Sequence, residues 1–119
     1  MSKLLIVDDE MDIREFAKNF FKKRGIAVFT ASGGGEALEI IRDEAPDLIL
    51  LDVRMEEMTG IEVLRQLRGE NNQSKVFMVT GVEDPDTIEE ANTLGVLGYI
   101  HKPLVLDELE KLVLRELTD

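Results

Sequence analysis

The sequence has no cysteine and only one histidine among its 119 residues. The absence of cysteine excludes a disulfide framework and a thiolate zinc site, and a single histidine excludes a metal site built from several imidazoles. No apolar run approaches the roughly 18 residues that a membrane span requires. The amino terminus leads into a very short apolar run, which argues against a secretory signal peptide. These absences favour a cytoplasmic protein without a membrane partner.

Basic residues are scarce beside acidic ones, with 14 Lys and Arg against 25 Asp and Glu and a formal net charge of −11. An acidic surface repels phosphate backbones, so direct nucleic-acid binding is not expected. Hydrophobic residues make up 44% of the chain, which is enough for a core of ordinary size. The length suits one domain, and we expect it to span residues 1–119.

Apolar runs alternate with segments of helical periodicity along the whole chain. We predict strands at 3–7, 26–31, 48–51, 76–79 and 96–100. We predict helices over 10–24, between the glycine run 33–35 and Pro46, from Gly60 to a polar connection at 69–74, over 85–94 and over 106–117. Strands separated by helices imply right-handed crossovers and a parallel sheet that is covered on both faces. The predicted fold is a single three-layer α/β/α domain of (βα)5 type.

The first predicted helix carries its apolar residues at helical spacing, namely Ile13, Phe16, Ala17, Phe20 and Phe21. We assign these positions to one apolar face of that helix. Lys22, Lys23 and Arg24 crowd its last turn, where the helix dipole favours cations.

The run from Leu48 to Leu51 leads directly into Asp52. Consecutive apolar residues are typical of a central parallel strand that is buried on both faces. An Asp at the end of such a strand lies at the carboxyl edge of the sheet, where open α/β sheets bind their ligands. Taken alone, Asp52 could merely cap the turn that follows.

Polar side chains of complementary chemistry end four of the predicted strands: Asp8 and Asp9, Asp52, Thr80 and Lys102. Three carboxylates that lie close together repel one another unless a cation joins them. Oxygen ligands without sulfur or imidazole suit a hard ion, most simply Mg²⁺. A Lys and a hydroxyl suit phosphoryl oxygens, and a carboxylate can itself accept a phosphoryl group to form an acyl phosphate.

At these residues the chain resembles a response-regulator receiver domain of the CheY-like kind, the phosphoacceptor module of two-component signalling. The resemblance covers almost the whole chain and rests on Asp8-Asp9, Asp52-Val53-Arg54-Met55 with Gly60, Thr80-Gly81 and Lys102-Pro103. Each motif is weak alone, but their order and their places at strand ends make the set specific. The family has a flavodoxin-like fold with strand order 2-1-3-4-5.

The resemblance implies that Asp52 accepts the phosphoryl group from a sensor histidine kinase or a histidine phosphotransfer protein. It implies that Asp9 and Asp52 ligate Mg²⁺ directly, with the Arg54 backbone carbonyl as a third ligand and Asp8 acting through water. The family consists of signalling domains, so we do not expect an enzyme that turns over an external substrate.

The resemblance also implies roles for residues on the last two strands. Lys102 would pair with the phosphoryl oxygens, Thr80 would move to hydrogen-bond them, and Tyr99 would be the switch aromatic. The Lys102–Pro103 peptide bond is expected to be cis. The output surface would be the face of the fourth helix, fifth strand and fifth helix, residues 84–117, where an output domain, a protein partner or a second copy of the chain could bind.

The sequence departs from the family pattern at Glu56, where a proline is common, and Glu57 adds a further charge.

Three other functions remain as alternatives. An aspartate-based phosphatase would need a second Asp at the position that Arg54 occupies. A flavin or nucleotide carrier would be expected to show a glycine-rich phosphate motif, which the chain lacks. A degenerate receiver would not retain the full set of acidic, hydroxyl and lysine residues.

Overall fold

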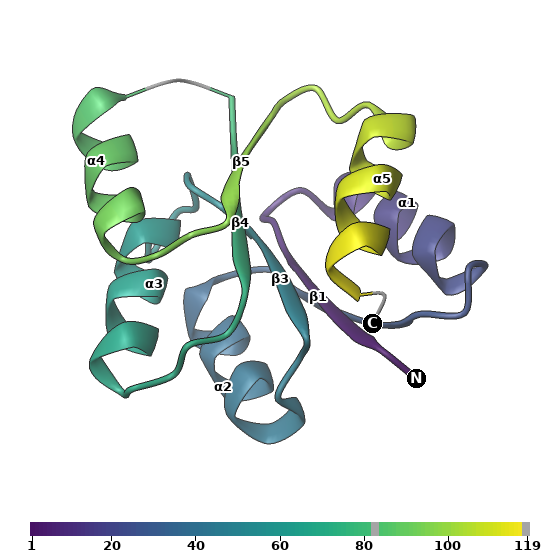
Figure 1. The fold of residues 1–119 in the computed structure, drawn as a ribbon, viewed down its shortest axis with the longest axis horizontal. Coiled ribbons are helices and arrows are strands. Elements are labelled where there is room, and N and C mark those ends of the chain that lie inside the picture. The colour runs from purple at the N-terminus through teal and green to yellow at the C-terminus, as the bar shows by residue number, and fades with distance from the viewer. Residues whose placement is uncertain (82–83, 118–119) are drawn as a thin grey trace.

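The computed structural model describes residues 1–81 and 84–117. Strands and helices alternate in this part of the chain: β1 (Lys3–Val7), α1 (Met11–Lys22), β2 (Ala27–Ala31), α2 (Gly34–Glu44), β3 (Leu48–Asp52), α3 (Gly60–Gly69), β4 (Val76–Thr80), α4 (Pro85–Thr93), β5 (Gly98–His101) and α5 (Leu106–Leu117). The strands form one parallel sheet in the order β2-β1-β3-β4-β5. Helices α1 and α5 lie on one face, and α2, α3 and α4 lie on the other (Figure 1). The predicted flavodoxin-like three-layer fold is therefore confirmed.

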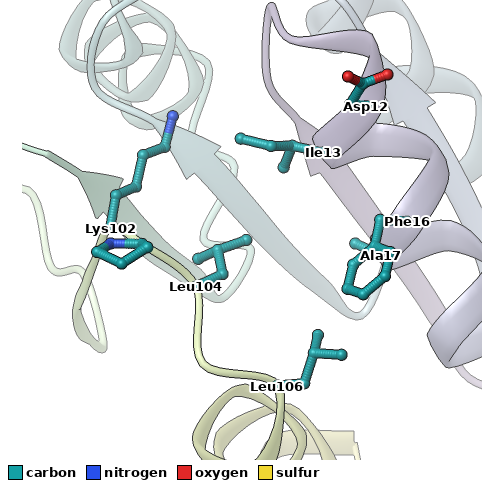
Figure 2. Close-up of a pocket in the computed structure, with 8 residues that line it drawn as sticks. Asp12, Ile13, Phe16, Ala17, Lys102, Leu104 and Leu106 are labelled. Atoms are coloured by element: carbon teal, nitrogen blue, oxygen red, sulfur yellow. The ribbon is translucent and has the colours of Figure 1, made fainter.

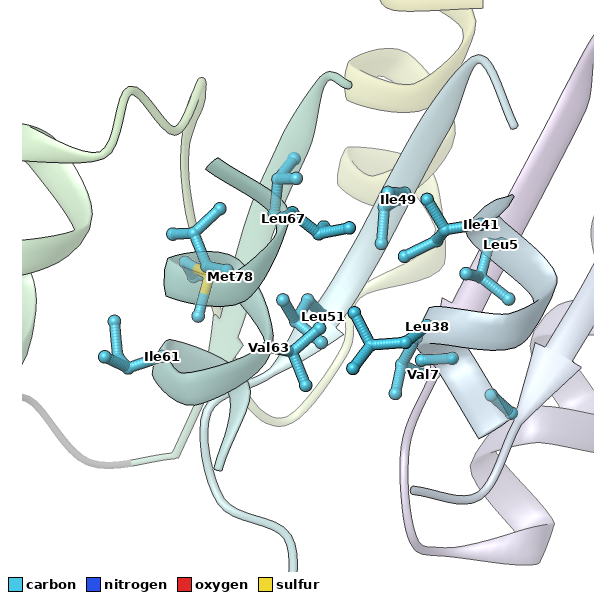
Figure 3. Packing of buried hydrophobic residues seen from close by; sticks show 14 of the residues in the cluster. Leu5, Val7, Leu38, Ile41, Ile49, Leu51, Ile61, Val63, Leu67 and Met78 are labelled. Carbon is cyan, nitrogen blue, oxygen red and sulfur yellow. The ribbon is translucent and has the colours of Figure 1, made fainter. Parts of the chain in front are cut away.

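The central strand β3 is buried along its whole length and divides its side chains between two hydrophobic clusters. Leu48 and Leu50 point into the cluster beneath α1 and α5, whereas Ile49 and Leu51 point into the cluster beneath α2 and α3 (Figure 3). This division follows from the two-residue period of a strand. Because both faces are covered, the continuous apolar run in the sequence is the expected pattern. Among the described residues, no helix has the length and apolar character to cross a membrane.

Two strands begin later than the sequence predicted, because the first residue assigned to each strand completes the end of the preceding helix. Ile26 donates its N–H to the Phe21 carbonyl (3.3 Å), so β2 begins at Ala27. Val96 donates its N–H to the Ala91 carbonyl (3.3 Å), and β5 runs over Gly98–His101 rather than 96–100. Apolar periodicity marks these residues as buried but does not show which element uses their backbone groups.

Helix α2 begins within the glycine run, with Gly33 at the N-cap and Gly34 as the first helical residue. A Cβ on Gly34 would lie 2.7 Å from Met58 Sδ and 2.9 Å from Val63 Cγ2. The glycine therefore allows the start of α2 to pack closely against Met58, which precedes α3, and against Val63 within α3.

Candidate functional site

The register of the sheet brings the predicted site residues to one edge. In the β1–β3 pair Val7 lies opposite Leu51, so the next residues, Asp8 and Asp52, emerge side by side. Thr80 ends β4 opposite His101, and Lys102 follows directly. Asp8, Asp52 and Thr80 are buried, with 2%, 3% and 5% of their surfaces exposed. Two carboxyl groups are thus held out of solvent at the end of the sheet.

Lys102 is the cation that these carboxyl groups share. Its Nζ lies 2.9 Å from Asp52 Oδ2 and 3.2 Å from Asp8 Oδ2. Glu10 Oε1 is a more distant third partner, at 3.9 Å. The Lys102 backbone N–H also donates to the Thr80 carbonyl (2.8 Å), which fixes the start of the lysine side chain beside β4. The Lys102–Pro103 peptide bond is cis.

Burial raises the pKa of the Asp52 carboxyl, and the charge of Asp8 raises it further, while the hydrogen bond from Lys102 offsets part of this shift. Burial also acts to lower the pKa of Lys102, but the attraction of Asp52 and Asp8 outweighs it and the net shift is upward. Lys102 therefore keeps its charge at neutral pH. The ionised form of Asp52 is held at a cost in folding free energy.

We expect Asp52→Asn to increase the free energy of unfolding at pH 7 by an amount on the order of 1 kcal/mol in metal-free buffer, because it removes a buried charge. A carboxyl whose pKa is raised by folding destabilises the fold above its folded pKa, and the penalty fades as the pH falls towards its unfolded value near 4. Urea unfolding with EDTA at pH 7 and at pH 4 measures the difference. Asp43→Asn, an exposed position with the same charge change, is the control. A variant that is less stable than the wild type at pH 7 would contradict the expectation.

A cluster of carboxylates lies beside the Lys102 site. One carboxylate oxygen from each of Asp8, Asp9 and Glu10 lies within 4.8 Å of the others, and the Glu10 N–H donates to Asp8 Oδ1 (2.9 Å). Asp9 and Glu10 are exposed, whereas Asp8 is buried. An all-oxygen donor set of this kind fits a hard divalent cation such as Mg²⁺. Glu10 is not among the metal ligands that the family resemblance implies, although it follows Asp8 and Asp9 directly in the sequence.

The segment after Asp52 is tied down at both ends by backbone hydrogen bonds. The Arg54 N–H donates to Asp52 Oδ1 (3.1 Å), and the Val53 N–H donates to the Val79 carbonyl (2.9 Å). The Gly60 N–H donates to the Val53 carbonyl (2.9 Å), which closes the loop of residues 53–59. A Cβ on Gly60 would lie 2.2 Å from the Asp52 carbonyl oxygen, so only glycine allows this approach.

We expect Gly60→Ala to lower the free energy of unfolding by about 2–3 kcal/mol, since the added methyl group would collide with rigid backbone. The same variant should displace the Asp52 carboxyl group. Gly69→Ala at the other end of α3 is the matched control, because a Cβ there meets nothing within 4 Å. Equal unfolding midpoints in urea for the two variants would show that the close approach at Gly60 carries no cost.

The acidic residues that depart from the family pattern, Glu56 and Glu57, are exposed. They border a recess of about 350 Å³ that is lined by Asp9, Ser32, Gly33, Met55, Glu56 and Glu57. The Arg54 side chain is exposed as well, and the backbone N–H of Arg54 is the group that contacts Asp52.

Tyr99 lies on β5, half-buried, with its hydroxyl donating to the Ile88 carbonyl (2.8 Å). The bond ties β5 to the middle of α4. Burial raises the pKa of the Tyr99 hydroxyl. Thr80 lies one strand away, at the buried end of β4. The switch roles of Thr80 and Tyr99 stay predictions.

An apolar groove of about 360 Å³ runs from Lys102 along α1 (Figure 2). Its lining consists of Asp12, Ile13, Phe16, Ala17, Lys102, Pro103, Leu104 and Leu106. Phe16 is 61% exposed, although its helical spacing placed it on the apolar face of α1. Ala17 and Phe21 fill the core instead. An exposed apolar surface next to a charged site is typical of a binding surface.

Comparisons with known proteins agree with this geometry. A family profile described as "Response regulator receiver domain" matches residues 4–114. Sporulation initiation phosphotransferase F of Bacillus subtilis is 38% identical over 93% of this chain and 90% of its own length. Regulatory protein AtoC of Escherichia coli is 36% identical over 98% of this chain, which spans only 25% of that protein. Among solved structures, Vibrio cholerae chemotaxis protein CheY4 superposes with a TM-score of 0.90, at 32% identity, over 98% of this chain and 99% of that one.

Proposed function

This chain belongs to the response regulator receiver domain family, and from that membership we propose that Asp52 accepts a phosphoryl group from a phosphohistidine of a sensor kinase or phosphotransfer protein. The observation that carries the proposal is the pairing of Lys102 Nζ with the buried Asp52 carboxylate at 2.9 Å. An ionised carboxylate beside a fixed cation is a nucleophile with a partner for the charge of an incoming phosphoryl group.

The transfer is a displacement at phosphorus. An Asp52 carboxylate oxygen forms the new P–O bond while the P–N bond of the donor phosphohistidine breaks, and the bonding pair returns to the imidazole nitrogen. The product is an acyl phosphate on Asp52 and a free histidine on the donor. Lys102 lies close enough to Asp52 and Asp8 to pair with the negative charge that arrives.

We propose that Asp9 and Asp52, with Asp8 and the Arg54 carbonyl, hold Mg²⁺. Glu10 lies in the carboxylate cluster with Asp8 and Asp9 and offers a further oxygen. When bound, the ion would neutralise charge on the acceptor and the phosphoryl group. Asp9 is exposed and therefore accessible to an ion from solvent.

The donor protein would bind to the apolar groove along α1. Lys102 is part of the groove lining, and its ammonium group forms an ion pair with Asp52, so the groove leads to the acceptor. Phe16 is the exposed large hydrophobic side chain of its lining. A helix of the donor that seats its apolar residues there would bring its phosphohistidine next to the acceptor.

The conformational change that follows phosphorylation would reach the face formed by α4, β5 and α5, where an output domain, a protein partner or a second copy of the chain could bind. Thr80 ends β4 next to the acceptor, and Tyr99 connects β5 to α4 through Ile88. A partner can shift the equilibrium between two states only if its affinity for them differs. A face that changes with phosphorylation meets that requirement.

Incubation of the protein with acetyl phosphate and Mg²⁺ tests the proposed function directly. We expect intact-mass spectrometry to show one added phosphoryl group that hydroxylamine removes, as an acyl phosphate requires. An excess of EDTA should suppress the product. A stable adduct that resists hydroxylamine would show that the acceptor is not a carboxylate.

Phe16→Ala should slow phosphotransfer from a phosphorylated donor protein by about tenfold, the effect of losing roughly 1.4 kcal/mol of apolar contact. Its rate with acetyl phosphate should match the wild type, because a small donor needs no groove. Met11→Ala is the control, since Met11 is as exposed on the same helix but lies outside the groove lining. A loss of rate with both donors would place the defect in the acceptor site rather than in docking.

A further inference from the structure

The C-terminal end of helix α4 has no cation of its own. Ala91 is its one fully buried residue, and its last turn contains no basic residue. The end of a helix presents carbonyl groups without intrahelical partners, and these favour a cation. The α4 sequence supplies none.

Arg68 of α3 supplies the missing cation from the neighbouring helix. Its Nε donates to the Leu94 carbonyl at 2.7 Å, and its Nη2 donates to the Gly95 carbonyl at 3.4 Å. Its Nη1 donates to the carbonyls of Asn72 and Ser74, at 2.9 and 3.0 Å. One guanidinium thus joins the C-terminal end of α4 to the connection between α3 and β4.

The backbone at this end of α4 is closed by a second, independent set of bonds. Gly95 adopts a left-handed conformation, with φ of 79°, and donates its N–H to the Asn92 carbonyl (3.1 Å). Val96 donates its N–H to the Ala91 carbonyl (3.3 Å). This pattern is the Schellman motif, and it leaves the Leu94 and Gly95 carbonyls for Arg68.

The first turn of α4 is capped by bonds of short range. Asp84 caps it, accepting from the Asp86 N–H (3.2 Å) and from the Thr87 hydroxyl (2.9 Å). The Tyr99 hydroxyl reaches the middle of the helix at the Ile88 carbonyl. The capping bonds act within one turn of the helix, whereas the Tyr99 bond joins its middle to β5.

We propose that Arg68 is a positioning residue that anchors the C-terminal end of α4, so that the helix changes position by pivoting about that end. Release of the Tyr99–Ile88 bond then frees the N-terminal half alone. The signalling role of this pivot rests on the proposed function, whereas the anchoring is a property of the unphosphorylated protein.

Amide hydrogen exchange on the full chain, followed by NMR, tests the anchor. The amides of Gly95 and Val96 report on the anchored end, and the Ile88 amide, which donates to the Asp84 carbonyl, reports on the N-terminal half. We expect Arg68→Gln to speed exchange at Gly95 and Val96 by about tenfold or more, the loss expected for bonds from a charged donor.

Arg65→Gln is the matched control, because Arg65 is on the same helix and pairs with Glu90 of α4 at an exposed site. It should change the same rates by less than about threefold, as is usual for an exposed ion pair. Arg68→Lys keeps the charge but loses the planar array of donors, so its rates should fall between those of the wild type and Arg68→Gln. Amides of β3 report global stability in every variant, which separates loss of the anchor from general unfolding.

Tyr99→Phe then distinguishes a pivot from simple stabilisation. With Arg68 intact it should speed exchange at Ile88 and leave Gly95 and Val96 unchanged, whereas in the Arg68→Gln background it should speed exchange at all three. Equal effects of Arg68→Gln and Arg65→Gln would overturn the anchor. A response of all three amides to Tyr99→Phe alone would overturn the pivot.

Beryllofluoride with Mg²⁺, which mimics an acyl phosphate, separates failure of the pivot from failure of the proposed function. If beryllofluoride does not change hydrogen exchange in the loop of residues 53–59, the proposed function is wrong. The comparison of Arg68→Gln with Arg65→Gln still tests the anchor in that case. If exchange in the loop changes, and the exchange rate of the Val96 amide changes more than that of the Ile88 amide, the proposed function stands and the pivot is wrong.

Discussion

Asp52→Asn is expected to take up no phosphoryl group from acetyl phosphate or from a phosphorylated donor protein. The amide lacks the anionic oxygen that attacks phosphorus, and it cannot form an acyl phosphate. The variant should nevertheless fold, because Asn fills nearly the same volume and removes a charge that burial penalises. Intact-mass spectrometry under conditions that label the wild type to completion measures the difference, which should be total.

Asp43→Asn has the same change in net charge on the exposed surface of α2 and should be labelled at the wild-type rate. The buried neighbour Asp8 is the informative comparison within the site, because it shares Lys102 with Asp52. Asp8→Asn should retain a single labelled position at Asp52. Labelling of Asp52→Asn to the wild-type extent would mean that the acceptor lies elsewhere.

Asp9→Asn is expected to weaken Mg²⁺ binding by at least about tenfold, the lower end of the effect of altering a metal site. Asp9 is the exposed member of the pair that follows β1, and its carboxylate lies in the cluster with Asp8 and Glu10. Without a cation, this group of carboxylates would face an incoming anion. Titration of Mg²⁺ into the protein, followed by amide chemical shifts near Asp9, measures the affinity without any phosphorylation step.

The control for this variant is Asp12→Asn, which changes the same charge in the first turn of α1 but lies outside the carboxylate cluster. Its Mg²⁺ affinity should stay within about twofold of the wild type, because an exposed charge at this range is largely screened by salt. Glu10→Gln distinguishes the two candidate ligand sets. A larger loss for Glu10→Gln than for Asp9→Asn would exchange their proposed roles.

The architecture was predictable because it is carried by local patterns. Consecutive apolar residues such as Leu48–Leu51 predict a strand covered on both faces, and alternation with helices leaves few parallel topologies. The order 2-1-3-4-5 came from the family resemblance rather than from periodicity. Strand starts were displaced at Ile26 and Val96, because hydrogen bonds that close the preceding helix are invisible to apolar spacing.

The sequence by itself determined which polar residues follow the strands, and therefore that Asp8, Asp52, Thr80 and Lys102 meet at one edge of the sheet. Only the tertiary structure decided how they meet there, with Lys102 shared between two buried carboxyl groups and Glu10 drawn into the acidic cluster. The tertiary structure also decided that Phe16 is exposed and that Arg68 of α3 contacts the C-terminal end of α4. The physical reason is that neighbouring residues in the sequence decide which helix or strand a residue belongs to and whether it lies at the end of that element. The contacts of Lys102, Glu10, Phe16 and Arg68 depend instead on how whole helices pack on the sheet.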